Sequence, residues 1–343
     1  MQIGEIKEKL ATKEYDFLRE EKSLGSALML LTLGGSHAYG MDKEGSDLDI
    51  RGIALNSKEE VLLGEDFEQV VEEKTDTVIY SFHKMLCLLA ANNPNTIEIL
   101  GCKPEHYLYL SDLGRELKEN RHMFLSKICI HAFGGYAQSQ LRRMENKAAR
   151  LVGQAQQEAY ILRSIENAKY DFKTRYFPHE NSDIALYIDK AVQKGYESEI
   201  FMDVHLEHYP LRDWAGMWNE MKAIVSSYNK IGKRNEKAIS HDKLGKHMAH
   251  LIRLYMMCLD ILEKEEIITY REAEHELLMD IRNGKYLDEN RQPLDSFYDM
   301  LNEYEKRLDY AKKHTSLPDL PDRKKIREFQ LYVNERIVKR ETC

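Results

Sequence analysis

The chain has 343 residues and a formal net charge of −8, from 50 Lys and Arg residues against 58 Asp and Glu residues. Hydrophobic residues make up 43% and charged residues 31%, a composition that is typical of a globular protein and excludes a disordered chain. The acidic balance also excludes non-specific nucleic-acid binding by the whole surface, so any nucleic-acid contact has to come from a local basic patch.

The apolar runs and the cysteines indicate the cellular compartment of the protein. The longest apolar run, Ala27–Leu33, is far shorter than the roughly 20 residues that cross a bilayer. The N-terminal segment is charged and lacks the apolar core of a secretion signal. The 5 cysteines have no CxxC spacing, which is typical of reduced thiols and speaks against a structural zinc site. We therefore expect a cytoplasmic protein without membrane contact.

The first hundred or so residues predict a mixture of helices and strands. Apolar residues at helical spacing predict a helix over 3–21. A short apolar run that ends in Gly34-Gly35-Ser36 predicts a buried strand over 27–33 followed by a glycine turn. Three further strands are expected at 49–56, 69–72 and 76–82. A helix is expected at 83–92.

The remainder of the chain, from Ser111 onward, predicts helices. Two examples are Asp213–Ile224, whose Trp214 and Trp218 we expect in the core, and Lys246–Glu265. We expect an α+β protein, with a small mixed-sheet domain over 1–110 followed by a larger helical domain over 111–343. Within the second domain, residues 145–240 read as a helical insertion without an assigned role.

One stretch of the first domain carries the pattern of a reactive site. Ten residues separate Ser36 from Asp47, and Asp47 and Asp49 are two apart at the start of an expected strand. Residues two apart in a strand point to the same face, so both carboxylates aim at one spot. Carboxylates at such range repel each other unless a cation joins them, and oxygen ligands favour Mg²⁺ or Mn²⁺.

The glycine turn adds groups that suit a phosphate. Gly34 and Gly35 let backbone N–H groups approach a phosphate closely, and Ser36 adds a hydroxyl donor. A metal ion and a polyphosphate would then lie side by side, as phosphoryl or nucleotidyl transfer requires.

The arrangement Gly35-Ser36, ten residues, Asp47-x-Asp49 resembles the signature of the DNA polymerase β superfamily of nucleotidyltransferases. GSHAYGMDKEGSDLDIRG, DTVIYSFHKML and NNPNTIEIL are similar to the RNA-repair-pathway group of that superfamily, often labelled RlaP. A later stretch, Lys246–Leu254 followed by LLMDIRNGKY, resembles the same group. The family usually has Arg where this chain has His37.

This resemblance implies a role for each matching residue. Asp47 and Asp49 would bind two Mg²⁺ ions, and Asp76 would complete the metal site and help to deprotonate the attacking hydroxyl. Gly35 and Ser36 would hold the β and γ phosphates of an incoming NTP. The alternatives for the third carboxylate are Glu72, Glu73 and Glu98. An acceptor hydroxyl would attack the α-phosphorus in line and release pyrophosphate.

Two readings stay open for the later basic residues. Lys246, His250 and Arg253 follow each other at helical spacing, which suits either a line of contacts to a triphosphate or nucleic-acid strand, or a solvated helix face. The resemblance favours the first reading, as does the basic balance of residues 230–253. Arg51 would pair either with a phosphate or with a neighbouring carboxylate.

The sequence leads to a Mg²⁺- or Mn²⁺-dependent nucleotidyltransferase that moves NMP from an NTP to an acceptor hydroxyl. An RNA end, such as that of a tRNA-like molecule, is the expected acceptor. Two alternatives remain, namely transfer to a protein or small molecule, and a non-catalytic nucleotide-binding module of the antitoxin type. The oligomeric state and the choice of NTP are not encoded in these patterns.

Overall fold

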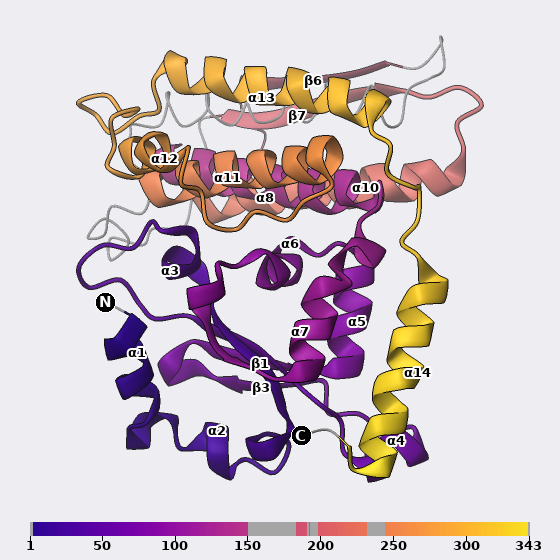
Figure 1. Ribbon diagram of the computed structural model, residues 1–343. Helices are drawn as coiled ribbons and strands as arrows, with labels where there is room; N and C mark the ends of the chain where they lie inside the picture. The colour runs from indigo at the N-terminus through magenta and orange to yellow at the C-terminus, as the bar shows by residue number, and fades with distance from the viewer. Residues whose placement is uncertain (1–2, 150–182, 191, 193–197, 232–243, 342–343) are drawn as a thin grey trace. The chain divides into compact units, whose positions relative to one another are not determined.

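The computed structural model describes residues 3–149, 183–190, 192, 198–231 and 244–341 (Figure 1). The chain forms two compact units, and each is built from separate stretches of sequence. Unit 1 comprises Met1–Gln138, Ala249–Asp280 and Asp299–Cys343, and unit 2 comprises Ser139–Met248 and Ile281–Tyr298.

Unit 1 is built on a five-stranded mixed sheet with the strand order β3-β4-β2-β1-β5. β2 and β4 are parallel, whereas the other neighbouring strands are antiparallel. The strands are β1 (Leu28–Leu33), β2 (Ile50–Ala54), β3 (Gln69–Glu72), β4 (Thr77–Ser81) and β5 (Tyr107–Leu110).

Burial explains why the apolar runs became central strands. β1 reads LMLLTL, and all of its residues after Leu28 are buried, as expected for a strand covered on both faces. Thr32 is the polar exception, and its hydroxyl donates to the carbonyl oxygen of His106 at 3.1 Å. Four expected strands are confirmed by β1 to β4, whereas β5 is a strand that the sequence pattern did not indicate.

Short helices and turns connect these strands. The expected helix over 3–21 is interrupted at Thr12, whose hydroxyl donates to the Lys9 carbonyl oxygen and ends the first helix. The α-helices up to residue 149 are α1 (Ile3–Leu10), α2 (Phe17–Glu20), α3 (Gly35–Tyr39), α4 (Lys58–Leu63), α5 (Phe82–Ala90), α6 (Pro94–Ile97), α7 (Asp112–Glu119) and α8 (Ile128–Ala149). Single 3₁₀ turns lie at Lys13–Tyr15, Gly25–Ala27, Glu73–Thr75, Glu98–Gly101, Pro104–His106 and Arg121–Phe124.

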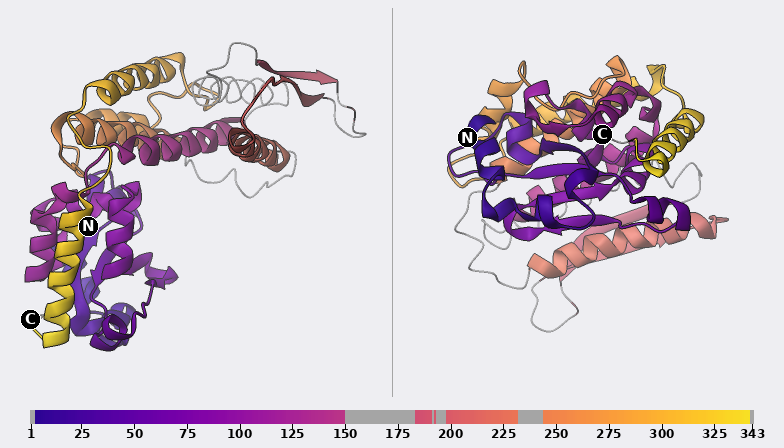
Figure 2. Two further views of the ribbon diagram at one scale, coloured as in Figure 1. Left: turned by 90° about the vertical axis from the view of Figure 1, so that its right-hand side faces the viewer. Right: turned by 60° about the horizontal axis from the view of Figure 1, so that its bottom comes forward.

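The later part of the chain is mainly helical. Its helices are α10 (Leu211–Ile231), α11 (Leu244–Lys264), α12 (His275–Arg282), α13 (Asp295–His314) and α14 (Arg323–Lys339). α14 runs beside α5 in both Figure 1 and Figure 2, and Phe329 meets Phe82 edge to face with ring centroids 6.1 Å apart. The last helix therefore completes the core around the N-terminal sheet.

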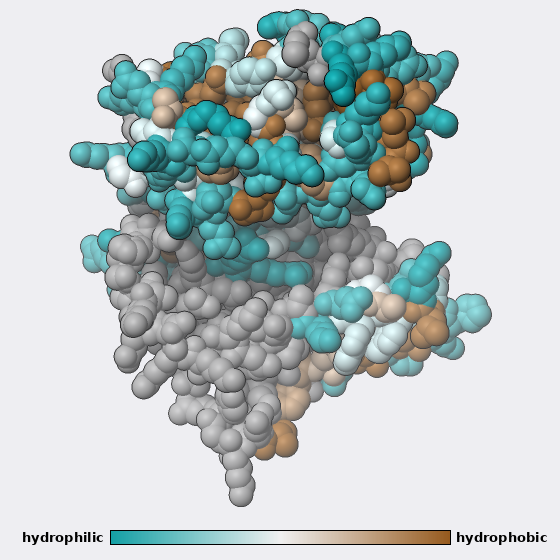
Figure 3. Space-filling model, turned by 90° about the horizontal axis from the view of Figure 1, so that it is seen from below, coloured by the Kyte–Doolittle hydropathy of each residue, from teal (hydrophilic) through white to brown (hydrophobic). Residues whose placement is uncertain are grey.

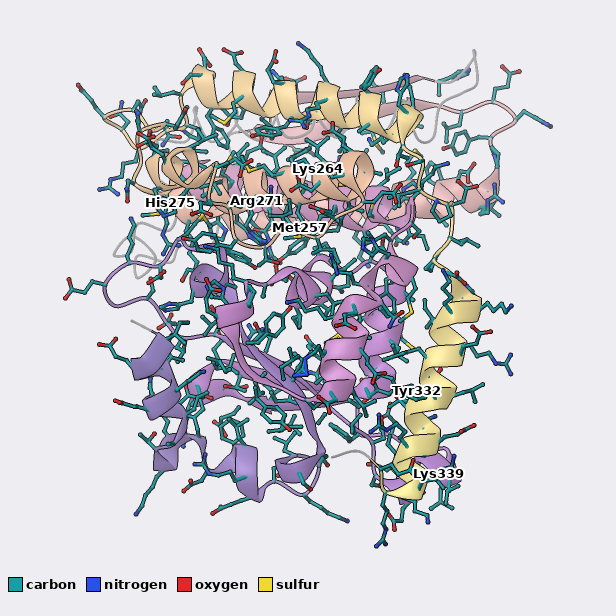
Figure 4. The ribbon with its side chains drawn as sticks, in the orientation of Figure 1. Met257, Lys264, Arg271, His275, Tyr332 and Lys339 are labelled. Carbon is teal, nitrogen blue, oxygen red and sulfur yellow. The ribbon has the colours of Figure 1, made fainter. Side chains whose placement is uncertain are left out.

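α11 is a core helix along most of its length. Every residue from Leu251 to Leu262 is buried, including two charged ones. One of these, Asp260, forms ion pairs with Arg271 at 2.5 Å and with Lys264 at 2.8 Å, both labelled in Figure 4. This buried stretch includes Arg253, so neither a solvated face nor an exposed basic stripe extends to that residue.

Unit 2 contains a hairpin that the sequence pattern did not lead us to expect. β6 (Asp183–Lys190) and β7 (Ser198–His205) pair antiparallel inside the segment expected to be helical. Large aliphatic residues recur at every second position of each strand, although hydrophobic residues also stand between some of them. They are Ile184, Leu186 and Ile188 in β6, and Ile200, Met202 and Val204 in β7. The expected helices over 213–224 and 246–265 are confirmed by α10 and α11, but Trp218 is 54% exposed rather than part of the core.

The fold class agrees with the expectation: a mixed five-stranded sheet with helices is followed by a mainly helical part. The domain boundary near residue 110 stays a prediction. Within the described ranges no helix has the length and apolar character needed to span a membrane. The coloured residues of the face in Figure 3 are mostly hydrophilic, with hydrophobic residues in separate groups.

Candidate functional site

The turn after β1 brings the backbone of Gly35 against the side chain of Asp49. The Gly34 N–H donates to the Asp49 carbonyl oxygen at 2.8 Å. Gly35 has a φ of +52° and starts the short helix α3. A Cβ on Gly35 would lie 1.6 Å from Asp49 Oδ2, so this position has room for glycine alone. The predicted glycine turn and one predicted carboxylate are therefore in direct contact.

Asp47 and Asp49 lie in the extended segment just before β2, which begins at Ile50 rather than at Asp49. Burial alternates along this segment: Leu48 and Ile50 are buried, Asp47 is exposed and Asp49 is half-buried. The expected common side for the carboxylates of Asp47 and Asp49 stays a prediction, because the two residues precede the strand.

The parallel pairing of β2 with β4 brings Asp76 beside Asp49. Ile50 pairs with Thr77, so the residues immediately before them are neighbours across the sheet, and the Ile50 N–H donates to the Asp76 carbonyl oxygen at 3.3 Å. Asp76 adopts a left-handed conformation with a φ of +44°, and its side chain is 56% exposed. Two of the predicted carboxylates therefore begin adjacent strands.

Arg51 joins these two carboxylates. Its Nη2 lies 3.2 Å from Asp76 Oδ1 and 3.6 Å from Asp49 Oδ1, and its Nη1 donates to the Asp76 carbonyl oxygen at 2.5 Å. Of the two interpretations of Arg51, pairing with neighbouring carboxylates is confirmed. A positive group therefore already lies where the like charges of Asp49 and Asp76 meet.

The carboxylate oxygens of Asp49 and Asp76 are suitable ligands for a hard cation, although they are not arranged as a complete metal site. Carboxylate oxygens from Asp49 and Asp76 face one cationic group, which is the environment that Mg²⁺ or Mn²⁺ would also find favourable. However, the described part of the chain contains no group of three His, Cys, Asp or Glu side chains arranged to hold a metal ion. Asp47, Asp49 and Asp76 thus do not form one three-ligand group.

The remaining residues of α3 are buried. Ser36 is 7% exposed, and its carbonyl oxygen accepts the Met41 N–H at 2.9 Å, which closes the helix. His37 is also buried, and its Nδ1 lies 3.4 Å from Asp42 Oδ2. The tight packing fixes the backbone of this turn relative to β1 and β2.

Glu98, one alternative for the third carboxylate, belongs to a different cluster. Its side chain is buried and accepts a hydrogen bond from the Tyr39 hydroxyl at 2.6 Å and from Arg253 Nη1 at 3.1 Å. Burial raises the pKa of Glu98, against the opposing effect of Arg253. Glu72 accepts the Lys74 N–H within its own turn.

The predicted basic stripe on α11 is divided. Arg253 is 1% exposed and ion-paired with Glu98, His250 is half-buried with its Nδ1 3.0 Å from Arg253 Nη2, and Lys246 is exposed. His250 and Arg253 belong to unit 1, whereas Lys246 belongs to unit 2. These three side chains do not form one exposed row, and their contact with a triphosphate stays a prediction.

One protein family matches the part of the chain that contains this site. Residues 9–175 match the model of RlaP, the RNA repair pathway DNA polymerase beta family. Over these residues the chain is similar to that family. The RlaP region contains the glycine turn, all three predicted carboxylates and Arg51, and it indicates a nucleotidyltransferase tied to an RNA repair pathway. No curated protein and no solved structure matches this chain.

The match to RlaP ends at residue 175. It therefore does not include Lys246–Leu254 or the LLMDIRNGKY segment, which also resemble this family in the sequence. The sequence pattern also did not predict that Tyr39, Glu98 and Arg253 form one cluster. Glu98 is 59 residues from Tyr39 and 155 residues from Arg253, and no local spacing signals such a contact.

Proposed function

We propose that the protein is a magnesium-dependent nucleotidyltransferase that transfers NMP from an NTP to a hydroxyl at an RNA end. One observation carries the proposal: the Asp49 carboxylate is packed against the glycine turn and lies beside Asp76 at the start of the adjacent parallel strand. This juxtaposition places groups suited to a phosphate next to groups suited to a cation.

The roles in this proposal are those that the family resemblance implies. Asp47, Asp49 and Asp76 would hold Mg²⁺ or Mn²⁺, which when bound lowers the pKa of the attacking hydroxyl and stabilises the developing charge. The backbone of Gly35 and the hydroxyl of Ser36 bind the β and γ phosphates of the NTP. Asp76, the more exposed carboxylate of the adjacent pair, takes the proton of the acceptor hydroxyl.

Arg51 holds the carboxylates of Asp49 and Asp76 at the same edge while no substrate is bound. Its side chain is 22% exposed, so the guanidinium group has room to exchange partners at this edge. If Asp49 and Asp76 held a cation instead, the guanidinium group of Arg51 would be available to bind the negative charge of a triphosphate.

The RNA acceptor is supported by the family description, which ties this region to RNA repair. The basic balance of residues 230–253 also supports it, although residues 232–243 lie outside the described part of the chain. The net charge of −8 supports the second candidate, transfer to a protein or small-molecule hydroxyl. The test therefore has to separate the acceptors.

The proposal is tested with Asp47→Asn, Asp49→Asn and Asp76→Asn, and with Glu44→Gln as an exposed control from the same loop. Each protein is incubated with each of the four labelled NTPs, Mg²⁺ or Mn²⁺, and separate pools of RNA, protein and small molecules. We expect label in RNA and release of pyrophosphate from the wild type and from Glu44→Gln. The three Asn variants should lose at least about 10²-fold in rate.

Three results would count against this function. Undiminished transfer by Asp49→Asn would remove the mechanism. Label found in the protein or small-molecule pool alone would reject the RNA acceptor and support the second candidate. Nucleotide binding without pyrophosphate release in any pool would favour the non-catalytic module.

A further inference from the structure

We infer that Arg253 is a positioning residue that acts through Glu98 and Tyr39 to hold helix α3, the helix that carries Gly35 and Ser36. The inference rests on the proposed function for its effect on turnover. It assigns Arg253 to the support of the phosphate-binding turn rather than to direct contact with the triphosphate.

The contacts form a closed triangle. The Tyr39 hydroxyl and Arg253 Nη1 donate to the same oxygen of Glu98, Oε2, at 2.6 Å and 3.1 Å. The guanidinium carbon of Arg253 also lies 3.5 Å from the centroid of the Tyr39 ring, a cation–π contact. Each member therefore touches the other two, and all three are buried.

Further contacts anchor the triangle in unit 1. The Thr269 hydroxyl donates to the Glu98 carbonyl oxygen at 2.6 Å, and His250 Nδ1 lies 3.0 Å from Arg253 Nη2. Arg253 itself belongs to α11, and Met257, labelled in Figure 4, is buried one turn further along this helix. Tyr39 thus meets a rigid partner rather than a mobile side chain.

The need for such an anchor follows from the size of α3. This helix has 5 residues, and isolated helices shorter than about 12–15 residues are marginal in water. Tyr39 is its last residue, three positions after Ser36, so a fixed Tyr39 ring fixes the far end of the turn. The near end is fixed by the contact of Gly35 with Asp49.

Burial speaks against direct contact between Arg253 and a triphosphate. The side chain is 1% exposed, and Nη1 and Nη2 already face Glu98 and His250. Withdrawal of Arg253 toward a phosphate would leave the buried Glu98 carboxylate without its cation, which is strongly unfavourable.

The decisive variants are Arg253→Lys, Glu98→Gln and Tyr39→Phe, together with the double variant Tyr39→Phe/Glu98→Gln. Tyr39→Phe removes a single oxygen and keeps the ring, so it tests the anchor even where a charge variant fails to fold. Arg271→Lys is the matched control, because Arg271 is an equally buried arginine of unit 1 that pairs with Asp260 instead.

Two measurements are needed on the full chain. Hydrogen exchange of the backbone amides of residues 35–41 reports on α3 whether or not the protein is active. We expect faster exchange there in all three single variants and no change in Arg271→Lys. Pyrophosphate release should show kcat lowered by about 10²-fold in Arg253→Lys, because a displacement of about 1 Å costs that much, with KM for the NTP little changed. The double variant should lose no more kcat than Glu98→Gln.

Other outcomes overturn the inference. Unchanged exchange at residues 35–41 in Arg253→Lys would show that Arg253 does not hold α3. A raised KM with unchanged kcat and unchanged exchange would assign Arg253 to direct phosphate contact. If the wild type releases no pyrophosphate, the proposed function fails, while faster exchange in the variants still supports the anchoring of α3 by Arg253.

Discussion

The contact between Gly35 and Asp49 shows how a single residue without a side chain defines the site. The carboxylate of Asp49 occupies the volume that any Cβ at position 35 would fill. Gly35 also has a positive φ, which L-residues other than glycine adopt at a cost of about 1–2 kcal/mol. The lack of space and the positive φ therefore both favour glycine at position 35.

Gly35→Ala is expected to abolish nucleotide transfer, because its methyl group displaces the Asp49 carboxylate. Gly64→Ala is the matched control: Gly64 also has a positive φ, +70°, but nothing lies within 4 Å of its added Cβ. Both variants should lose about 1–2 kcal/mol of unfolding free energy through strain. Denaturant unfolding and pyrophosphate release check this, and equal activity in both variants would contradict the assigned role of the contact.

His106 is expected to make stability depend on pH. Burial lowers the pKa of His106 below 6.5, aided by the positive charge of Lys103 and opposed by Glu105 and Asp42. The folded state therefore favours neutral His106, and this contribution to stability is present above pH 6.5 and lost as the pH falls through the lowered pKa. The wild type should thus lose more unfolding free energy between pH 7.5 and pH 5 than His106→Phe.

The phenylalanine variant keeps a ring against Tyr270, which His106 meets edge to face. His314→Asn, an exposed histidine of α13, serves as the control and should follow the wild-type pH profile. Denaturant titrations at several pH values measure the difference. Parallel profiles for wild type and His106→Phe would show that His106 does not carry the pH dependence.

At the scale of single elements, the residue patterns predicted most of what positions the site. The apolar runs gave the limits of β1, β2 and β4 to within one or two residues, because buried strands need continuous apolar sequence. The meeting of Asp49 with Asp76 depends on parallel pairing between β2 and β4, a partnership that no local pattern specifies. The sequence therefore predicted both carboxylates as site residues but did not predict that they lie side by side on adjacent strands.

The close packing of α7 on β1 gives a prediction at this scale. A Cβ on Gly114 of α7 would lie 2.6 Å from the Met29 carbonyl oxygen, so Gly114→Ala pushes the helix away from the sheet and should destabilise by about 1–3 kcal/mol. Gly135→Ala in α8 meets nothing within 4 Å and should stabilise by about 0.5–1 kcal/mol. Thermal and denaturant unfolding measure both changes, and the same sign for both would contradict the packing argument.

At the scale of the whole molecule, unit 1 is assembled from three separate stretches of the chain. Stretches from the later part of the chain supply Arg253 and α14 to the unit that holds the sheet. The sequence predicted α11 as a helix but not its burial, because burial depends on contacts with residues more than a hundred positions away, such as Glu98.

The dependence of unit 1 on α14 can be tested with one aromatic residue. Phe329 is buried against Phe82 of α5, so Phe329→Ala should lower the unfolding free energy by about 3–5 kcal/mol. Leu331→Ala, at an exposed position of the same helix, should change it by no more than about 0.5 kcal/mol. Comparable losses in both variants would show that α14 does not complete this core.

The discontinuity of unit 1 also has a consequence for biosynthesis. The first stretch of the unit ends at Gln138, and α14 ends at Lys339, roughly 200 residues later, which takes about 10–40 s at 5–20 residues per second. Until the ribosome has released that helix, Phe82 lacks its contact with Phe329, and the side of α5 that packs on α14 stays uncovered. The incomplete unit 1 therefore exposes apolar surface that a chaperone can bind. Folding of unit 1 is completed only after α14 has been synthesised.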